Sequence, residues 1–187
     1  KSTLAYTMQY AAYGKFDGRD AAGNSTGTFS ATDFNFQVGV GRNWNRFYYG
    51  VNIKFIVSNL ASNTSIGLAS DVALGYHNPK TNWTATVILR NAGAELKPYI
   101  KGDSRQKLPL QLDISFSKRF KKIPVTISVT AHDLQVWNLR FPEEEQQTSI
   151  LGSTKKTSKS TQIIDNIFRH FAFGAEVQAG KPVRLRI

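Results

Sequence analysis

Hydrophobic and polar residues alternate along much of this chain with a period of two. The clearest stretch is 33–40, where the apolar positions are Phe34, Phe36, Val38 and Val40. Adjacent side chains of a β-strand point to opposite faces, so this segment is predicted to have one apolar and one polar face. A helix would instead show a period of about 3.6 residues.

The alternation predicts nine strands and no long helix. The strands span roughly residues 3–16, 29–40, 47–57, 66–76, 82–90, 110–117, 125–132, 171–177 and 183–187. Short connections at 42–46, 77–81, 119–123 and 180–182 alternate with longer ones at 17–27, 59–64, 92–108 and 133–169. Alternating short turns and long loops are typical of outer-membrane barrels. We therefore predict an all-β fold, an antiparallel up-and-down transmembrane β-barrel.

The predicted barrel forms one domain over residues 1–187. Bacterial single-chain barrels usually have an even number of strands, so nine strands lead us to expect that this chain is only part of the barrel. A polar external loop is expected at 141–165, and Ile163–Phe168 is expected to form a short helical turn that caps the barrel mouth.

The two columns of each strand predict two environments. The polar columns are candidate lumen positions: Asp33, Asn35, Asn52, Lys54, Asp71, Arg90 and Asp113. The apolar columns are candidate lipid-facing positions: Phe34, Phe36, Val38, Val51, Ile53 and Phe55. Several strands reach the length that crosses a bilayer at a tilt, and aromatic residues gather near strand ends, as they do at membrane interfaces. A soluble β-sandwich or lipocalin-like barrel would also alternate and stays open at this point.

The composition adds a strong positive charge. The net charge is +11, from 24 Lys and Arg against 13 Asp and Glu, so anionic partners are expected. The basic residues lie mainly in loops and turns, as in Lys118–Lys122, which does not favour nucleic acid as a partner. Such a turn can contact lipid headgroups or an acidic protein, or simply be solvated. The chain contains no run of about 18 apolar residues, so no transmembrane helix is predicted.

No pattern in the chain predicts catalysis. His132 and Asp133 resemble part of a triad, but neighbouring residues of a strand face opposite ways and no Gly-x-Ser-x-Gly motif accompanies them. The three histidines are widely spaced, and cysteine is absent. We therefore predict no enzyme, no catalytic residues, no metal site and no cofactor.

Several residue blocks resemble the PorQ family of outer-membrane barrels of the type IX secretion system, which is related to PorV and the FadL-type barrels. The blocks are residues 27–34, 50–56, 65–76, 89–93, 108–109, 131–134 and 167–176. Their order along nearly the whole chain carries the resemblance, and Phe168–Phe171 is the most distinctive block.

The resemblance implies a non-enzymatic protein of the bacterial outer membrane that anchors an attachment complex at the cell surface. Its implied partners are a PorZ-like protein, PorU, PorV, outer-membrane lipids and lipopolysaccharide. Phe168, Arg169 and His170 are the candidate partner surface. The alternatives are a FadL-like transporter of hydrophobic small molecules and a soluble β-barrel that binds anionic ligands.

Overall fold

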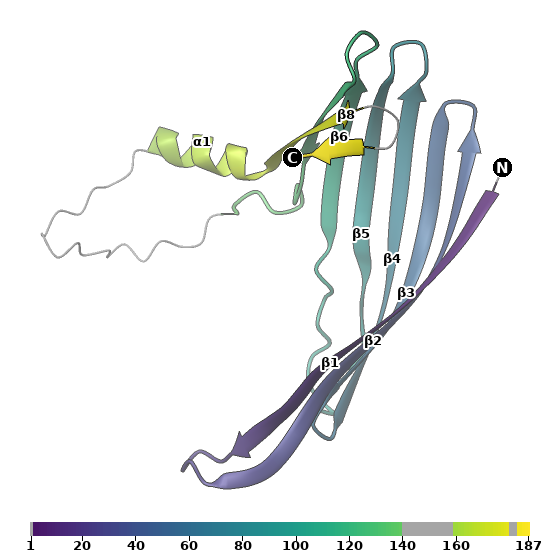
Figure 1. The fold of residues 1–187 in the computed structure, drawn as a ribbon. Helices are drawn as coiled ribbons and strands as arrows, with labels where there is room; N and C mark the ends of the chain where they lie inside the picture. The colour runs from purple at the N-terminus through teal and green to yellow at the C-terminus, as the bar shows by residue number, and fades with distance from the viewer. Residues whose placement is uncertain (1, 140–158, 180–182) are drawn as a thin grey trace, which may run out of the picture. The chain divides into compact units, whose positions relative to one another are not determined.

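The computed structural model describes residues 2–139, 159–179 and 183–187. Within them, nine strands form one antiparallel sheet in which each strand neighbours the next along the chain (Figure 1). The strands are β1 (Ser2–Arg19), β2 (Ser25–Trp44), β3 (Phe47–Leu60), β4 (Asn63–Asn78), β5 (Trp83–Lys97), β6 (Gln111–Arg119), β7 (Val125–Ala131), β8 (Phe171–Ala179) and β9 (Val183–Arg186). The prediction of an all-β, up-and-down sheet is confirmed. The described strands do not close into a barrel, because β1 and β9 stand at opposite ends of the strand order.

Two compact units divide the chain. The first comprises residues 1–76 and 88–111, and the second comprises residues 77–87 and 112–187. In the first unit, long antiparallel pairings place Val40, Val51 and Val72 side by side, and the next row holds Gly39, Asn52 and Asp71. Paired residues share a face of the sheet, so the apolar and polar columns of neighbouring strands are in register.

The same register continues within the second unit. Phe116 on β6 pairs with Val129 on β7, which in turn pairs with Phe173 on β8. The neighbouring row on the other face holds Ser115, Thr130 and Ala172. Alternation in the sequence therefore becomes a continuous separation of apolar from polar side chains across β6, β7 and β8.

The predicted lengths of two connections are wrong. β3 and β4 are joined by Ala61 and Ser62 alone, and five residues join β1 to β2. Residues that we expected in loops extend the strands instead, so β1 to β5 have 18, 20, 14, 16 and 15 residues. Polar residues such as Asn59 and Asn63 are typical of a loop in the sequence. In the structure Asn59 pairs with Thr64 and Asn63 pairs with Leu60, at the end of the hairpin.

Helix α1 (Lys159–Arg169) is longer than the helical turn predicted at 163–168. Its first residues fall within the polar loop predicted at 141–165, and residues 141–158 of that loop lie outside the described residues. No helix in the described part of the chain combines the length and the apolar character needed to cross a membrane.

The described residues include almost no apolar interior. Among them, Ala69 is the single hydrophobic residue that counts as buried, at 3% exposure. A soluble sandwich or barrel buries most of its large apolar side chains. The apolar columns of this sheet therefore lie on its surface.

Candidate functional site

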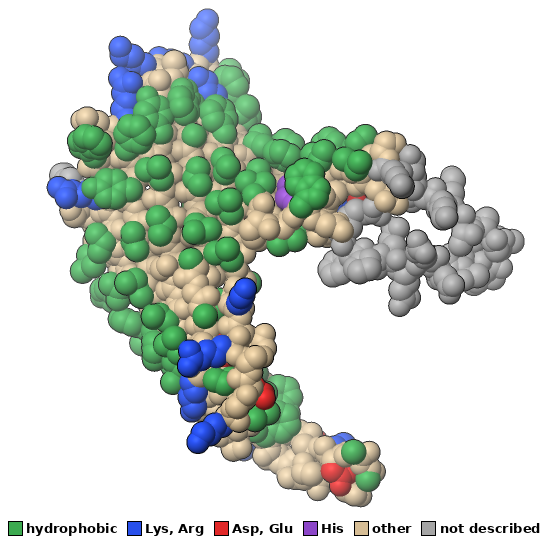
Figure 2. Space-filling model, turned by 180° about the vertical axis from the view of Figure 1, so that it is seen from behind, with side chains coloured by type: hydrophobic (Ala, Val, Ile, Leu, Met, Phe, Trp, Pro, Cys, Tyr) green, Lys and Arg blue, Asp and Glu red, His purple; other side chains and the backbone are tan. Residues whose placement is uncertain are grey.

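The apolar face of the first unit is exposed over three neighbouring strands, β2, β3 and β4. Its exposed side chains range from 38% to 55% exposure and include Phe36, Val38, Val40, Val51, Ile53, Phe55, Leu68, Val72 and Leu74. Phe34 lies on the same face and is half-buried. In Figure 2, hydrophobic side chains cover much of the visible face. Scattered exposed hydrophobic residues are normal, but a contiguous patch marks a surface that contacts an apolar environment.

The second unit shows the same arrangement. Ile114 and Phe116 on β6, Ile127 on β7 and Phe173 on β8 are exposed by 43% to 67%. On the opposite face, Asp113 is buried at 8% exposure. Along the strands, each unit thus exposes apolar side chains on one face and covers charged side chains such as Lys54 and Asp113 on the other, the reverse of the usual arrangement in a soluble domain.

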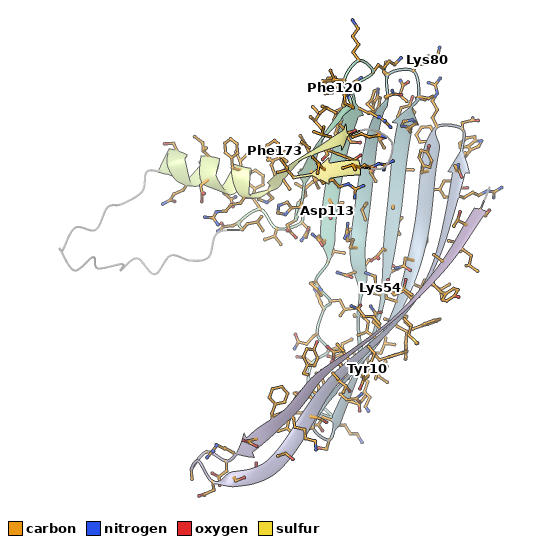
Figure 3. All side chains as sticks on the ribbon, viewed as in Figure 1. Tyr10, Lys54, Lys80, Asp113, Phe120 and Phe173 are labelled. Atoms are coloured by element: carbon orange, nitrogen blue, oxygen red, sulfur yellow. The ribbon has the colours of Figure 1, made fainter. Side chains whose placement is uncertain are left out.

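Lys54, Asn52 and Asp71 form a hydrogen-bonded network on the polar face of the first unit (Figure 3 labels Lys54). Lys54 Nζ lies 2.8 Å from Asp71 Oδ1 and donates to Asn91 Oδ1, also at 2.8 Å. Asn52 Nδ2 lies 3.2 Å from Asp71 Oδ2 and 2.8 Å from Gln37 Oε1. The side chains of Lys54 and Asp71 are only 14% and 21% exposed, so each charge is balanced by the other.

Asn91 introduces an irregularity into β5 that this network uses. Its φ of 56° is in the left-handed region, and its backbone N–H donates to Asp71 Oδ1 at 2.9 Å. Two residues later, the backbone of Gly93 lies so close to β4 that an added Cβ would come within 2.1 Å of Leu68 O. Asp71 therefore replaces the hydrogen bond that the irregular strand would otherwise lack.

Asp33 is the centre of a second polar cluster on the first unit. Tyr13 donates its hydroxyl proton to Asp33 Oδ2 at 2.7 Å, and Ser58 donates to Asp33 Oδ1. Tyr99 donates in turn to the Ser58 hydroxyl at 2.6 Å. These contacts join β1, β2, β3 and the segment after β5. Four of the predicted lumen positions therefore belong to side-chain networks: Asp33, Asn52, Lys54 and Asp71.

The other predicted lumen positions lie in different settings. Asn35 is half-buried, and its Oδ1 is buried without a hydrogen-bond partner among the described residues. Arg90 is exposed at the end of the regular part of β5. Asp113 lies in the second unit, where its Oδ1 accepts from the backbone N–H of Asp133 at 3.3 Å. Sequence alternation predicts their face but not these partners.

Asp113 and Asp133 repeat the relation between Asp71 and Asn91. Asp133 also has a left-handed backbone, with φ of 55°, and its N–H is held by the carboxylate of the preceding strand. His132 Nδ1 donates to Asp133 Oδ2 at 2.7 Å. This hydrogen bond holds the pKa of Asp133 below its ordinary value. Both residues follow the end of β7 at Ala131, so the expectation that their side chains face opposite ways along a strand is wrong for this pair.

A hollow of about 450 Å³ lies on the polar face of the first unit near the β2–β3 turn. It is lined mostly by small or polar side chains: Thr3, Ala5, Thr7, Gln37, Gly39, Gly41, Gly50, Asn52, Asp71 and Ala73. Glycine and alanine leave this end of the polar face open, whereas Lys54 and Asp33 fill the region beside it.

The candidate partner residues are not equivalent. Phe168 is 64% exposed, and Arg169 forms an exposed ion pair with Asp165 at 2.9 Å. His170 is buried at 5% exposure, and its ring nitrogens lie 2.8 Å and 3.0 Å from the carbonyl oxygens of Asn166 and Val136. The ring of His170 is therefore not part of the exposed surface that Phe168 and Arg169 offer.

Asn166 fixes α1 to the segment after β7, a role that the sequence analysis missed. Its side chain accepts from Leu139 N at 3.0 Å and donates to Trp137 O. Ile163, Ile164, Ile167 and Phe168 are 41% to 64% exposed, and Trp137 is 74% exposed. The helix is thus held by polar contacts and presents apolar side chains outward, the reverse of an ordinary surface helix. The available signal was Asn166 itself, a polar residue between Ile164 and Ile167.

Among the described residues, no group of three or more histidine, aspartate or glutamate side chains could hold a metal ion. Comparisons with protein-family models and with curated proteins find no match for this chain.

Proposed function

We propose that this chain forms part of the wall of a bacterial outer-membrane β-barrel. Its apolar face contacts lipid, and its polar face borders an aqueous interior. The observation that carries this proposal is the inverted distribution of side chains: Ile53 is 55% exposed, whereas Lys54, the next residue, is only 14% exposed and paired with Asp71. Lipid would cover the exposed apolar face, just as the packed interior of a soluble domain covers the apolar faces of its strands.

Strand length supports the same proposal. The apolar column of β3 runs from Phe47 to Val57. A strand rises about 3.4 Å per residue and tilts by about 40° in such barrels, so this column would span about 26 Å of membrane thickness. That length matches the apolar band of an outer-membrane barrel, which is about 25 Å tall.

Within the membrane, the barrel acts as a non-enzymatic anchor and docking scaffold of the type IX secretion system. The residue blocks that resemble the PorQ family support this role, and the implied partners are a PorZ-like protein, PorU and PorV. The exposed apolar side chains of α1 offer a surface on which such a partner could pack. A FadL-like conduit for hydrophobic molecules fits less well, because Asp33, Lys54 and Asp71 would line it.

Membrane fractionation of cells that make the full protein tests both parts of the proposal. We expect detergent to extract the protein and high salt to leave it in the membrane fraction. Release by salt alone would contradict the membrane location. Mass spectrometry of the detergent eluate should then find attachment-complex proteins.

Substitutions on α1 test the docking surface. Ile164→Ser with Phe168→Ser should reduce the co-purified partner while leaving the barrel in the membrane, because both side chains are exposed. Ile123→Ser, at another exposed apolar position outside α1, is the matched control and should have no effect. Equal recovery of partner from all three proteins would contradict docking through α1.

A further inference from the structure

Two short turns of the second unit carry basic residues and no acidic ones. The β4–β5 turn contains Lys80, and the β6–β7 turn follows Lys118 and Arg119 and contains Lys121 and Lys122. Residues 77–87 and 117–127 contain no aspartate or glutamate. The two segments therefore concentrate positive charge at one end of their strands.

Hydrogen bonds hold these two turns together. Arg119 N donates to Asn82 O at 2.9 Å, and Lys118 Nζ donates to Thr81 O. Arg119 also donates from its guanidinium to Gln178 Oε1 at 2.7 Å. The β4–β5 and β6–β7 turns therefore form one continuous surface.

Three lysines on this surface are available to an anion. Lys80, Lys121 and Lys122 are exposed, and within the described residues no carboxylate forms an ion pair with them. Figure 3 shows Lys80 at the same end of the strands as Phe120. Three like charges that have no carboxylate partner in the described part of the chain attract a polyanionic surface.

Aromatic side chains lie directly beside the charged turns. Trp83 and Phe116 stack with ring centroids 5.7 Å apart, and Phe120 and Ile123 are 38% and 51% exposed. In membrane proteins, aromatic residues lie at the edge of the hydrocarbon layer and basic residues lie beyond them, among the lipid headgroups. The second unit has the same order here.

The first unit has the same arrangement of aromatic and basic residues at its β2–β3 turn. Trp44 is 69% exposed at the end of β2, and Phe47 and Tyr76 pack edge to face at 5.1 Å. Arg42 and Arg46 lie beside them, and Arg46 donates to the Tyr76 hydroxyl at 3.4 Å. The β2–β3 turn of the first unit and the short turns of the second unit thus both combine aromatic with basic residues.

We propose that the surface formed by the β4–β5 and β6–β7 turns binds the headgroups of anionic phospholipids in the leaflet that borders these turns. This inference rests on the proposed membrane location and adds a lipid preference to it. Lys80, Lys121 and Lys122 contact the lipid phosphates, and Trp83, Phe116 and Phe120 set the depth of the turns in the interface.

Reconstitution of the full protein tests this lipid preference. Vesicles of phosphatidylcholine would carry a trace of spin-labelled phosphatidylglycerol or spin-labelled phosphatidylcholine, and the fraction of each label immobilised on the protein gives a selectivity ratio. We expect the unmodified protein to prefer phosphatidylglycerol. Joint substitution of Lys80→Ser, Lys121→Ser and Lys122→Ser should lower the ratio by about fivefold or more.

The matched control removes equal charge from the other end of β5. Lys97→Ser, Lys101→Ser and Lys107→Ser change three exposed lysines at or after that end and should leave the ratio unchanged. An equal ratio in all three proteins overturns the inference. Loss of the preference on adding inorganic phosphate at constant ionic strength also overturns it, since it would indicate an ion site.

Two further outcomes separate this inference from the proposed function. A protein that enters no vesicle of either lipid contradicts the membrane location itself. A protein that enters both without preferring phosphatidylglycerol, and that loses an acidic protein partner on substitution of the three lysines, contradicts only the lipid site and assigns the turns to protein docking.

Discussion

Asp71 carries the largest share of the polar contacts on the polar face of the first unit. It accepts hydrogen bonds from Lys54, Asn52 and the backbone of Asn91, and so ties β3, β4 and β5 together. Because Lys54 is mostly covered, loss of the carboxylate would leave an uncompensated charge in a confined place.

Asp71→Leu should lower the free energy of unfolding by about 2–3 kcal/mol. The double variant Lys54→Met with Asp71→Leu should recover part of that loss, because it removes the stranded charge as well. Urea unfolding of the reconstituted protein measures both. Asp103→Asn, in an exposed turn, serves as the control and should be neutral. A double variant no more stable than the single one would contradict the pairing.

The hydrogen bond between His132 and Asp133 predicts a pH dependence. Because folding lowers the pKa of Asp133, the contact stabilises the folded state above the ordinary carboxyl pKa of about 4. That stabilisation is lost as the pH falls through the lowered pKa. The free energy of unfolding should therefore decline as the pH falls below about 4. Asp133→Asn, which keeps the left-handed backbone accessible, should show a smaller decline, and an unchanged decline would exclude Asp133 as a source.

Gly93 determines whether β5 can pair with β4. A Cβ at this position would lie 2.1 Å from Leu68 O and 2.5 Å from Ala69 Cα, and both are backbone atoms that cannot move independently. Gly93→Ala should therefore impair folding, seen as loss of the heat-modifiable band in gel electrophoresis. Gly67→Ala, where a Cβ meets side chains at 3.7 Å and beyond, should fold normally. Normal folding of both variants would show that β5 does not approach β4 so closely.

The sequence predicted the strands well because alternation records which face each side chain occupies. All nine predicted strands are present in the described residues, and Val51, Ile53 and Phe55 lie on the exposed face. The two-residue turn at Ala61 and Ser62 was missed, because polar residues that pair at a hairpin end have the same composition as a loop.

The irregularities of the strands could not be predicted from alternation. Asn91 breaks the period of β5, and the contact that compensates for it comes from Asp71, 20 residues earlier. Likewise, α1 depends on contacts of Asn166 with Trp137 and Leu139, which the sequence does not pair. Such partners follow from strand register and tertiary packing, and a local pattern contains neither.

Opposite faces of the whole sheet should respond differently to the same added charge. Val72 is 45% exposed on the apolar face, whereas its neighbour Ala73 lines the hollow on the polar face. Val72→Arg should cost about 2–4 kcal/mol in a bilayer, because the guanidinium would enter hydrocarbon. Ala73→Arg should cost much less, since water reaches the hollow. Urea unfolding in vesicles compares the two, and equal costs would contradict the assignment of the faces.

At the scale of the whole molecule, the proposed membrane location requires that the apolar face of the sheet meets lipid. The chain contains no cysteine, so single cysteines can be placed without a background signal. The informative pairs are adjacent residues of one strand, Gln37→Cys with Val38→Cys on β2 and Asn52→Cys with Ile53→Cys on β3.

The most direct measurement is the accessibility of these spin-labelled cysteines in the full protein in native outer membranes, read with a water-soluble and a lipid-soluble relaxation agent. Labels at Val38 and Ile53 should respond to the lipid-soluble agent alone, and labels at Gln37 and Asn52 to the water-soluble one. The opposite pattern, or a response to the water-soluble agent at all four positions, would contradict lipid contact by the apolar face.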